Sequence, residues 1–347
     1  MSGTSLDGLD IAHCSFVRRG ACWEYAILQA ETMAYSDEWI ERLSVVENFS
    51  ALEFVKTDIE YGHLLGQFTN GFIRKHKLTP DLIASHGHTV FHQPDQRITS
   101  QIGRGSAIAA ETGYPVVCDF RSLDVALGGQ GAPLVPIGDK LLFPDYDYCL
   151  NLGGFANIST DTEGGRIAFD LCPANIVLNR LAAATGANYD YNGDMARSGT
   201  AIPELLHQLN TLPFYRQPGP KSLGKEWVIS TIIPLLKGHK KPFPDLLATF
   251  CEHIALQVGA VMGRDPEKKM LVTGGGALNG FLVERIRHHV KPTVIIPDIL
   301  TINFKEALVF AFLGLLRWRN ENNCLRSVTG AACDNCGGAI YQGIRKH

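Results

Sequence analysis

Two stretches of the chain share the pattern that decides its fold, and they read YCLNLGGFANIS at 148–159 and KMLVTGGGALN at 269–279. In each stretch, a short apolar run of strand type leads into consecutive glycines. Patterns typical of helices follow or intervene at 176–184, 246–262 and 278–288. The repetition of strand, glycine turn and helix predicts an α/β protein.

Length and composition indicate a soluble chain of about two domains. Of the 347 residues, 45% are hydrophobic and 19% are charged, and the net charge is −3. Nucleic-acid-binding domains and polybasic membrane anchors are strongly basic, so we expect neither a nucleic acid nor a membrane as partner. The longest apolar run, 307–316, is much shorter than the roughly 20 residues of a membrane span. Asp7 and Asp10 fall where a signal peptide would need its apolar core, so we expect a cytoplasmic protein.

The nine cysteines are odd in number and scattered, which indicates free thiols rather than a disulfide framework. Cys333 and Cys336 form one local pair. A structural zinc site needs four ligands, and no second pair lies near these two in the sequence. We therefore expect a plain loop there, with zinc as the alternative.

The segments 1–16 and 151–170 resemble each other weakly, since each has small residues in a turn beside an alternating strand pattern. This similarity is a hint of a duplicated fold with a nucleotide between its halves. We expect one domain over 1–140 and a second over 141–320. The Gly- and Cys-rich tail, 321–347, is expected to return to one of them, the first domain being preferred.

The segment 2–10 reads SGTSLDGLD and favours a phosphate loop or a hairpin turn equally. Gly, Thr and Ser let the backbone approach phosphate oxygens closely. Asp7 and Asp10 repel phosphate but suit Mg²⁺, directly or through its waters. No Gly-Lys-Ser/Thr follows, so the segment is not a Walker loop.

The segment 166–175 reads RIAFDLCPAN and ends a strand in Asp170. A carboxylate fixed at the end of a strand is well placed to act as a general base. The alternative is an aspartate that caps the following helix, and from the residues alone the cap is favoured.

Three histidines, His86, His88 and His92, lie in the segment HGHTVFH. Their spacing suits a zinc site, but few acidic residues lie nearby and Gly87 predicts a turn. We favour hydrogen bonds from these side chains to a polyhydroxylated substrate.

Arg121 follows Asp119 and precedes the loop GGQGAPLVP at 128–136. An arginine in this setting is either a structural ion-pair partner or a bidentate grip on a carboxylate or phosphate. The turn at 274–276 is either a tight turn or a ligand site at the start of a helix. Glu306 is either a helix-dipole partner or a site residue.

Together, these stretches closely resemble one family, the 1,6-anhydro-N-acetylmuramic acid kinases of bacterial cell-wall recycling. The resemblance spans nearly the whole chain, and its motifs occur in family order: MSGTSLDGLD at 1–10, HGHT at 86–89, QIG at 101–103, DFR at 119–121, GGQGAPLVP at 128–136, NLGGFANIS at 151–159, FD at 169–170, KSLG at 221–224, DLLAT at 245–249, GGGALN at 274–279 and SVTGA at 327–331.

The resemblance implies an actin-like (ribonuclease H-like) fold of two α/β domains with mixed sheets flanking a nucleotide cleft. It implies ATP and Mg²⁺ as cofactors, with Asp7 and Asp10 near the metal. The implied nucleotide residues are Gly3, Thr4, Ser5, Leu6, Asp7, Gly8, Leu9, Asp10, Gly153, Gly154, Asn157, Gly274, Gly275, Gly276 and Asn279. The implied sugar residues are His86, His88, Arg121, Gln130 and Glu306.

Asp170 matches the base of similar enzymes, in which water opens the anhydro bridge and O6 takes the γ-phosphoryl group of ATP. The products are N-acetylmuramic acid 6-phosphate and ADP, and similar enzymes are often dimers. The rival functions are a same-fold relative with another sugar or with nucleotide binding alone, and a metal-dependent hydrolase that uses His86, His88 and His92.

Three features depart from the family pattern. The segment LCPA at 171–174 stands where the family has Thr-Gly-Pro-Gly, so we expect extra side chains where substrate approaches. His88 stands where Gln is common. Relatives carry a short apolar strand before the segment that starts here at Met1, so we expect the natural protein to begin several residues upstream.

Overall fold

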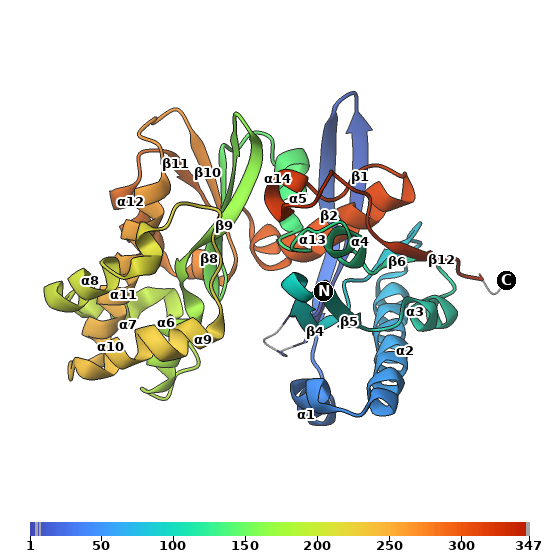
Figure 1. Ribbon diagram of the computed structural model, residues 1–347, viewed down its shortest axis with the longest axis horizontal. Coiled ribbons are helices and arrows are strands. Elements are labelled where there is room, and N and C mark those ends of the chain that lie inside the picture. The colour runs from blue at the N-terminus through green and yellow to red at the C-terminus, as the bar shows by residue number, and fades with distance from the viewer. Residues whose placement is uncertain (4–5, 7, 345–347) are drawn as a thin grey trace. The chain divides into compact units, whose positions relative to one another are not determined.

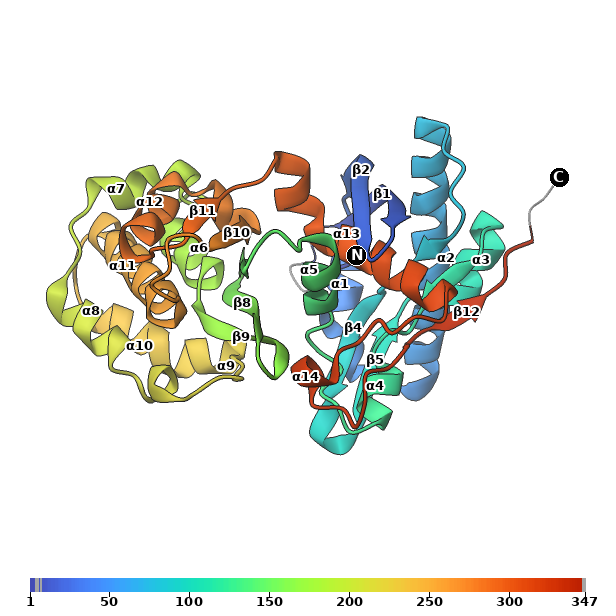
Figure 2. The same ribbon diagram turned by 90° about the horizontal axis from the view of Figure 1, so that it is seen from above.

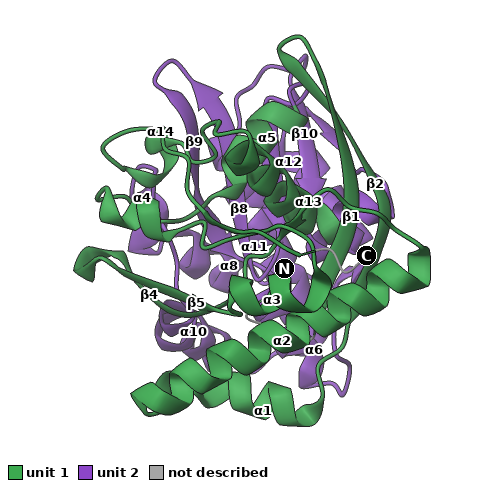
Figure 3. Cartoon of the chain, turned by 90° about the vertical axis from the view of Figure 1, so that its right-hand side faces the viewer, with its two compact units in different colours: residues 1–143, 304–347 green, residues 144–303 purple. Residues whose placement is uncertain are grey.

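The computed structural model describes residues 1–3, 6 and 8–344 and divides the chain into two compact units (Figure 3). Unit 1 comprises 1–143 and 304–347, and unit 2 comprises 144–303. The sequence prediction ended the second domain at 320, whereas the chain re-enters unit 1 at 304. The reason is the long apolar helix α13 (Ile299–Trp318), most of which belongs to unit 1, where Leu308 and Phe312 are fully buried.

Unit 1 combines a long hairpin, two further small sheets and several helices (Figure 1). Besides α13, its elements are β1 (Leu9–Arg19), β2 (Cys22–Met33), α1 (Asp37–Val45), α2 (Ala51–His76), β3 (Ile83–Ala84), β4 (His88–Gln93), β5 (Ile98–Ile102), α3 (Gly105–Thr112), β6 (Val116–Cys118), α4 (Ser122–Ala126), α5 (Val135–Leu142), α14 (Arg326–Thr329) and β12 (Ala339–Tyr341). Strand β1 pairs antiparallel with β2, β4 pairs antiparallel with β5, and β6 lies between β12 and β3.

A cavity of about 360 Å³, lined by both polar and apolar groups, lies between β1 and the segment 78–85 of unit 1. Leu65 and Phe72 of α2 and Phe310 of α13 contribute to its lining. Strand β1 pairs with β2 along its length and makes one further bridge, from Leu9 to Ser2, while β3 pairs with β6.

Unit 2 is built on one mixed sheet with the strand order β11-β10-β7-β8-β9. The bounds of its elements are β7 (Tyr148–Leu152), β8 (Phe155–Thr162), β9 (Gly165–Pro173), α6 (Asn175–Ala183), α7 (Asp194–Ser198), α8 (Pro203–Asn210), α9 (Lys225–Trp227), α10 (Ile233–Gly238), α11 (Phe243–Val261), β10 (Lys269–Thr273), α12 (Gly280–His289) and β11 (Thr293–Ile295). Strands β11, β10 and β7 run parallel, and β8 and β9 add antiparallel pairs. The expected α/β class with mixed sheets is confirmed.

The buried helix α11 organises the core of unit 2. It contacts α6, α7, α8, α12 and β9 (Figure 2), and its residues Phe250, Cys251 and Ile254 are fully buried. A helix that is apolar on nearly all sides must be surrounded by other elements, because it has no face suited to water. The core that results fixes the sheet on which the candidate site is built.

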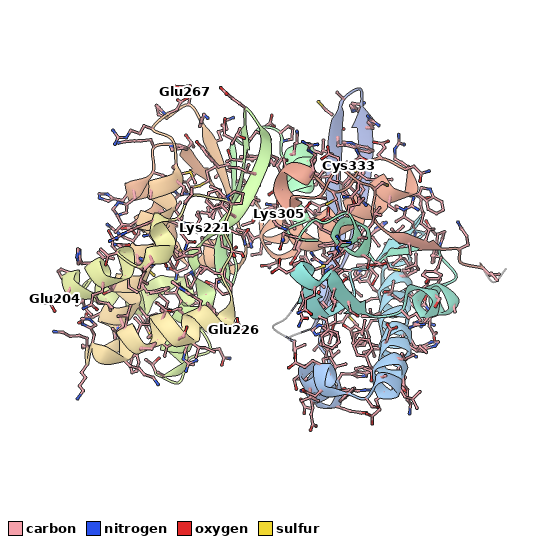
Figure 4. The ribbon with its side chains drawn as sticks, viewed as in Figure 1. Glu204, Lys221, Glu226, Glu267, Lys305 and Cys333 are labelled. Atoms are coloured by element: carbon pink, nitrogen blue, oxygen red, sulfur yellow. The ribbon has the colours of Figure 1, made fainter. Side chains whose placement is uncertain are left out.

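One helix in the described part of the chain, α13, is long and apolar enough to cross a membrane by length and composition alone. However, 61% of its most apolar stretch is buried inside the structure. Its Lys305 forms an ion pair of 2.7 Å with Asp139 of α5 (Figure 4). The helix therefore has the burial and pairing that are typical of a core helix in a soluble protein.

Helix α2 begins at a capping box and packs on α3 through small residues. Ser50 accepts the N–H of Glu53, and the Glu53 carboxylate accepts the N–H of Ser50, which satisfies two backbone donors at the helix start. A Cβ atom on Gly62 would lie 2.7 Å from the carbonyl oxygen of Arg104. A Cβ atom on Gly71, two and a half turns further on, would meet nothing within 4 Å.

These two glycines predict opposite effects of the same substitution. Gly62→Ala would overpack the contact with the Arg104 backbone and lower the free energy of unfolding by about 1–3 kcal/mol. Gly71→Ala would raise it by about 0.5–1 kcal/mol, because alanine favours the helix and has room. Urea denaturation of the two variants measures both changes, and a loss of stability in both would contradict the packing described here.

Candidate functional site

Four polar side chains form one row across the sheet of unit 2. Thr273 of β10 is paired with Asn151 of β7, Asn151 with Asn157 of β8, and Asn157 with Asp170 of β9. Directly opposed residues on neighbouring strands project from the same face of a sheet. Thr273 is buried and the other three are half-buried. The strands therefore bring the predicted base Asp170 and the predicted nucleotide residue Asn157 together.

A β-bulge beside this row sends the following side chains into the core. The register between β8 and β9 shifts so that Asn157 opposes Asp170 while Ala156 opposes Cys172, which leaves Leu171 as the extra residue. Leu171, Cys172 and Ala174 are 2%, 0% and 0% exposed and belong to the core of unit 2. The expectation that these residues add bulk where substrate approaches was wrong, because the bulge turns their side chains inward.

The Asp170 carboxylate is held by the segment that follows residue 216. Its Oδ2 accepts the backbone N–H of Leu223 at 2.9 Å, and its own N–H donates to the Lys221 carbonyl at 2.9 Å. Lys221, which lies near β9 (Figure 4), donates from Nζ to the carbonyls of Phe214 and Gln217, both at 3.0 Å. This segment therefore runs along β9 and fixes the orientation of the carboxylate.

The alternative in which Asp170 caps a helix was wrong. The N-cap of α6 is Ala174, which makes no side-chain bond. Instead, the N–H of Asn175 donates to the carbonyl of Gly153, and that of Ile176 to Gly154. The glycine turn does the capping, which leaves the carboxylate available for chemistry.

Burial raises the pKa of Asp170 above its ordinary value, and the hydrogen bond from the Leu223 N–H offsets part of that rise. A carboxylate with a raised pKa binds a proton more tightly and is a stronger base near neutral pH. The side chain is half-buried rather than sealed, so water can reach it.

The two glycine turns lie side by side because they follow adjacent parallel strands, β7 and β10. Gly274 has a φ of +79°, and a Cβ atom there would lie 2.5 Å from Oδ1 of Asn151. A Cβ atom on Gly276 would lie 2.6 Å from the Cβ of Leu152. In open α/β sheets, ligands bind beyond the carboxyl ends of the strands, and both turns occupy that position.

Asn279 and Gly275 complete the second turn. The turn continues through a short 3₁₀ helix (Gly275–Leu278) into Asn279, whose Oδ1 accepts the N–H of Leu282 at 2.9 Å. Asn279 is thus the N-cap of α12. Because the side-chain Oδ1 of Asn279 already accepts this bond, the predicted contact of Asn279 with a nucleotide would be made by its side-chain Nδ2.

Arg121 and His86 form the centre of a second polar group, within unit 1. Arg121 donates from Nε and Nη2 to Nε2 of His86 at 3.0 and 2.9 Å, and from Nη1 to the carbonyl of Gly131 at 2.6 Å. His86 Nδ1 lies 3.0 Å from the carbonyl of Gly87 and must donate to it. His86 is therefore neutral, and burial followed by the charge of Arg121 lowers its pKa well below the usual range.

The zinc alternative for the histidines is not favoured by these contacts. Both ring nitrogens of His86 are engaged, while His88 Nδ1 lies 3.2 Å from Ser2 Oγ and His92 Nδ1 lies 3.2 Å from Thr99 Oγ1. The described residues contain no group of three or more His, Cys, Asp or Glu that could hold a metal ion. Burial lowers the pKa of His88 and of His92, which favours neutral rings.

The predicted phosphate loop is only partly described. Thr4, Ser5 and Asp7 lie outside the described residues, while Gly3, Leu6, Gly8, Leu9 and Asp10 lie inside them. A Cβ atom on Gly8 would lie 2.7 Å from the Met33 carbonyl, so a glycine is needed there. Asp10 Oδ1 accepts the hydroxyl of Thr32 at 2.6 Å.

The two remaining predicted sugar residues are exposed. Gln130 donates its backbone N–H to the carbonyl of Thr329 at 2.8 Å, so its position is set by the main chain. Glu306 is exposed on α13, and its charge raises the pKa of Arg121 while burial lowers it more. The interpretation of Glu306 as a site residue near Arg121 therefore keeps its support.

Sequence reasoning missed three residues that complete these groups. Asn151 is a polar residue inside an otherwise apolar strand, and that contrast could have singled it out. Thr273 is the last residue of β10 and directly precedes the glycines at 274–276. It resembles Asn151 in being a polar residue at the end of an apolar strand that leads into glycines. Leu223 contributes only a backbone N–H, and no side-chain signal could have predicted that contact.

The family model for anhydro-N-acetylmuramic acid kinase matches residues 1–343. The chain belongs to the anhydro-N-acetylmuramic acid kinase family. It is 34% identical to a member from Sulfurovum sp. over 98% of this chain and 97% of that one. The values for a member from Saccharophagus degradans are the same, and a member from Pasteurella multocida is 33% identical over 98% and 95%.

Among solved structures, the activator of the 2-hydroxyisocaproyl-CoA dehydratase from Clostridium difficile with bound ADPNP shares 16% identity with this anhydro-N-acetylmuramic acid kinase family member. It covers 52% of this chain and 63% of its own, with a TM-score of 0.34. That likeness is too low to bear on the function.

The raised pKa of Asp170 predicts the pH dependence of this family member. A base must be ionised, so kcat/KM falls as the pH drops through the pKa of the base. We expect the acidic limb at a higher pH than for an ordinary aspartate, whose pKa is about 3.9. Initial rates between pH 4 and pH 8 measure it; a limb at or below the ordinary value would contradict the described burial.

Proposed function

We propose that the protein is an ATP-dependent kinase that opens the 1,6-anhydro bridge of anhydro-N-acetylmuramic acid and phosphorylates O6. Membership of the family gives this activity its main support. The observation that carries the mechanism is the half-buried Asp170, fixed at the end of the polar row with a raised pKa. The glycine turns next to the row support a nucleotide on the same sheet edge.

The proposed reaction joins a hydrolytic step to a phosphoryl transfer. Asp170 takes a proton from water, the water oxygen bonds to the anomeric carbon, and the bond from that carbon to O6 breaks. O6 then bonds to the γ-phosphorus, whose bond to the β-phosphate bridging oxygen breaks to release ADP. The proton on Asp170 returns to solvent, so the sum is sugar, water and ATP giving sugar 6-phosphate, ADP and a proton. General-base assistance of this kind typically contributes about 10²- to 10⁴-fold.

In unit 2, the nucleotide would meet backbone N–H groups at the turns 153–154 and 274–276. In unit 1, the segment 3–10 stays the predicted phosphate loop. Phosphoryl transfer needs mainly positioning and neutralisation of charge, which backbone dipoles and Mg²⁺ supply. Asp10 is the described carboxylate that suits Mg²⁺, as an oxygen ligand or through water. Its Oδ1 already accepts a hydrogen bond from the Thr32 hydroxyl at 2.6 Å.

On the sugar side, Arg121 would bind the lactyl carboxylate of the substrate. Its bonds to Gly131 and His86 fix the plane of the guanidinium, which still carries further N–H donors. A planar fork with a fixed orientation suits a carboxylate better than a flexible ammonium does. The neutral His86 adds no charge and serves to orient Arg121.

The substitution Asp170→Asn tests the proposed base. We expect kcat for sugar-dependent ADP release to fall at least about 10²-fold, since the amide cannot take the proton. The matched control is Glu163→Gln, which changes an exposed carboxylate in the turn between β8 and β9 and should leave the rate within twofold. Coupled measurement of ADP release gives both values.

The outcomes also separate the rival functions. No sugar-dependent ADP release by the wild-type protein would favour nucleotide binding without catalysis, and release with another amino sugar would indicate a changed substrate. ATP-independent turnover with bound zinc would favour the hydrolase. Full activity of Asp170→Asn would contradict the proposed base.

The substitution Arg121→Lys tests the sugar side. Lysine keeps the charge but loses the fork, so we expect the KM for the anhydro sugar to rise about tenfold or more, with the KM for ATP within twofold. Steady-state kinetics with each substrate varied in turn measure the two constants. Equal rises in both would contradict a role confined to the sugar.

A cytoplasmic location and a homodimer complete the proposal. ATP is an intracellular substrate, which supports the first. The homodimer stays a prediction. Light scattering of the protein in solution tests it, and a mass near twice that of the chain is expected.

A further inference from the structure

A buried carboxylate that the proposed mechanism does not use lies one turn beyond Arg121. Asp124 of α4 is 0% exposed. Moving a carboxylate out of water is costly unless hydrogen bonds replace its hydration. Hydrogen-bond donors must therefore surround the Asp124 carboxylate, and the segments that supply them are held together by it.

Four donors from two distant parts of unit 1 converge on Asp124. Its Oδ1 accepts from Thr329 Oγ1 at 2.9 Å, Asn335 Nδ2 at 2.8 Å and Cys324 Sγ at 2.9 Å. Its Oδ2 accepts the backbone N–H of Gly131 at 2.8 Å. The carboxylate thus joins the returning C-terminal segment to the glycine loop at 128–131.

The loop is shaped to bring its backbone onto this carboxylate. A Cβ atom on Gly129 would lie 2.2 Å from Asp124 Oδ2, and Gly131 has a φ of +66°. The N–H of Gly129 also donates to the Asp124 carbonyl at 2.9 Å. Both loop glycines are therefore needed for the contact, one for space and one for conformation.

Gly131 connects Asp124 to Arg121. Its N–H donates to Asp124, and its carbonyl accepts from Arg121 Nη1 at 2.6 Å. Arg121 is the N-cap residue of α4, and its Nε and Nη2 donate to His86. The guanidinium of Arg121 is therefore held by Gly131 on one side and by His86 on the other. Asp124 acts on it through Gly131, whose N–H it accepts.

We propose that Asp124 is a positioning residue for the sugar site, which aims the guanidinium of Arg121 by holding Gly131. Thr329 and Asn335 of the C-terminal segment add bonds to the other oxygen of the same carboxylate, and only the bond to Gly131 leads on to Arg121. This inference rests on the proposed function of Arg121 as the ligand of the sugar carboxylate.

The substitution Asp124→Asn tests it. Three donors point at Oδ1, so the amide oxygen will remain there and the NH₂ group will face the Gly131 N–H, donor against donor. The loop should then move away and release one end of Arg121. We expect the KM for the anhydro sugar to rise about tenfold or more, with the KM for ATP within twofold.

Thr329→Val is the matched control, because it removes a donor from the same carboxylate but leaves the Gly131 bond. It should lower the melting temperature and leave the sugar KM within twofold. A sugar KM that is unchanged in folded Asp124→Asn, or that rises equally in both variants, would overturn the proposal.

If Asp124→Asn does not fold, Gly131→Ala serves instead. Its Cβ would lie 2.6 Å from Val125 Cγ2 at a positive φ, which moves the same carbonyl. The same selective rise in sugar KM is expected, and an unchanged value would overturn the proposal.

Arg121→Lys, measured in parallel, separates a failure of the role proposed for Asp124 from a failure of the role proposed for Arg121. A raised sugar KM in Arg121→Lys without one in Asp124→Asn overturns only the role of Asp124. An unchanged sugar KM in Arg121→Lys overturns the proposed sugar role of Arg121, and the inference falls with it.

Discussion

The pairing of β7 with β10 on one side and with β8 on the other is the constraint on which unit 2 depends. It places Asn151 beside Thr273 and Asn157, and through β8 it sets the position of Asp170. The same parallel pair brings both glycine turns to one edge of the sheet. A shift of one residue in either pairing would place the row members of the two paired strands on opposite faces of the sheet. The catalysis proposed for Asp170 therefore depends on strand register before it depends on any single side chain.

In unit 1, orientation is achieved by a chain of hydrogen bonds rather than by a sheet. Asp124 holds Gly131, Gly131 holds Arg121, and Arg121 holds His86, through hydrogen bonds of 2.8, 2.6 and 3.0 Å. The neutral state of His86 follows from these contacts, since a protonated ring could not accept from Arg121. Buried networks of this kind hold a single geometry when fully satisfied and lose it when one member changes.

The α/β class and the two glycine turns could be predicted, because they depend on local patterns of residues. The role of Asp170 as a base came from the family resemblance and stays a prediction. The inward turn of Leu171 and Cys172 could not be predicted, since a bulge depends on how β8 and β9 align. The prediction that Asp170 caps a helix was wrong for a similar reason. The carbonyls of Gly153 and Gly154, which lie on another strand connection, accept the first N–H groups of α6. The domain boundary near 304 and the role of Asp124 depend on contacts between segments about 200 residues apart, such as Asp124 with Cys324.

The central claim, that Asp170 activates the water that opens the anhydro bridge, is tested most directly by a single turnover in H₂¹⁸O, with the product analysed by mass spectrometry. The account predicts ¹⁸O in the anomeric hydroxyl of the sugar 6-phosphate and none in its phosphate, with no labelled product from the Asp170→Asn variant on the same timescale. Label in the phosphate, or labelled product formed by the variant at the wild-type rate, would contradict it.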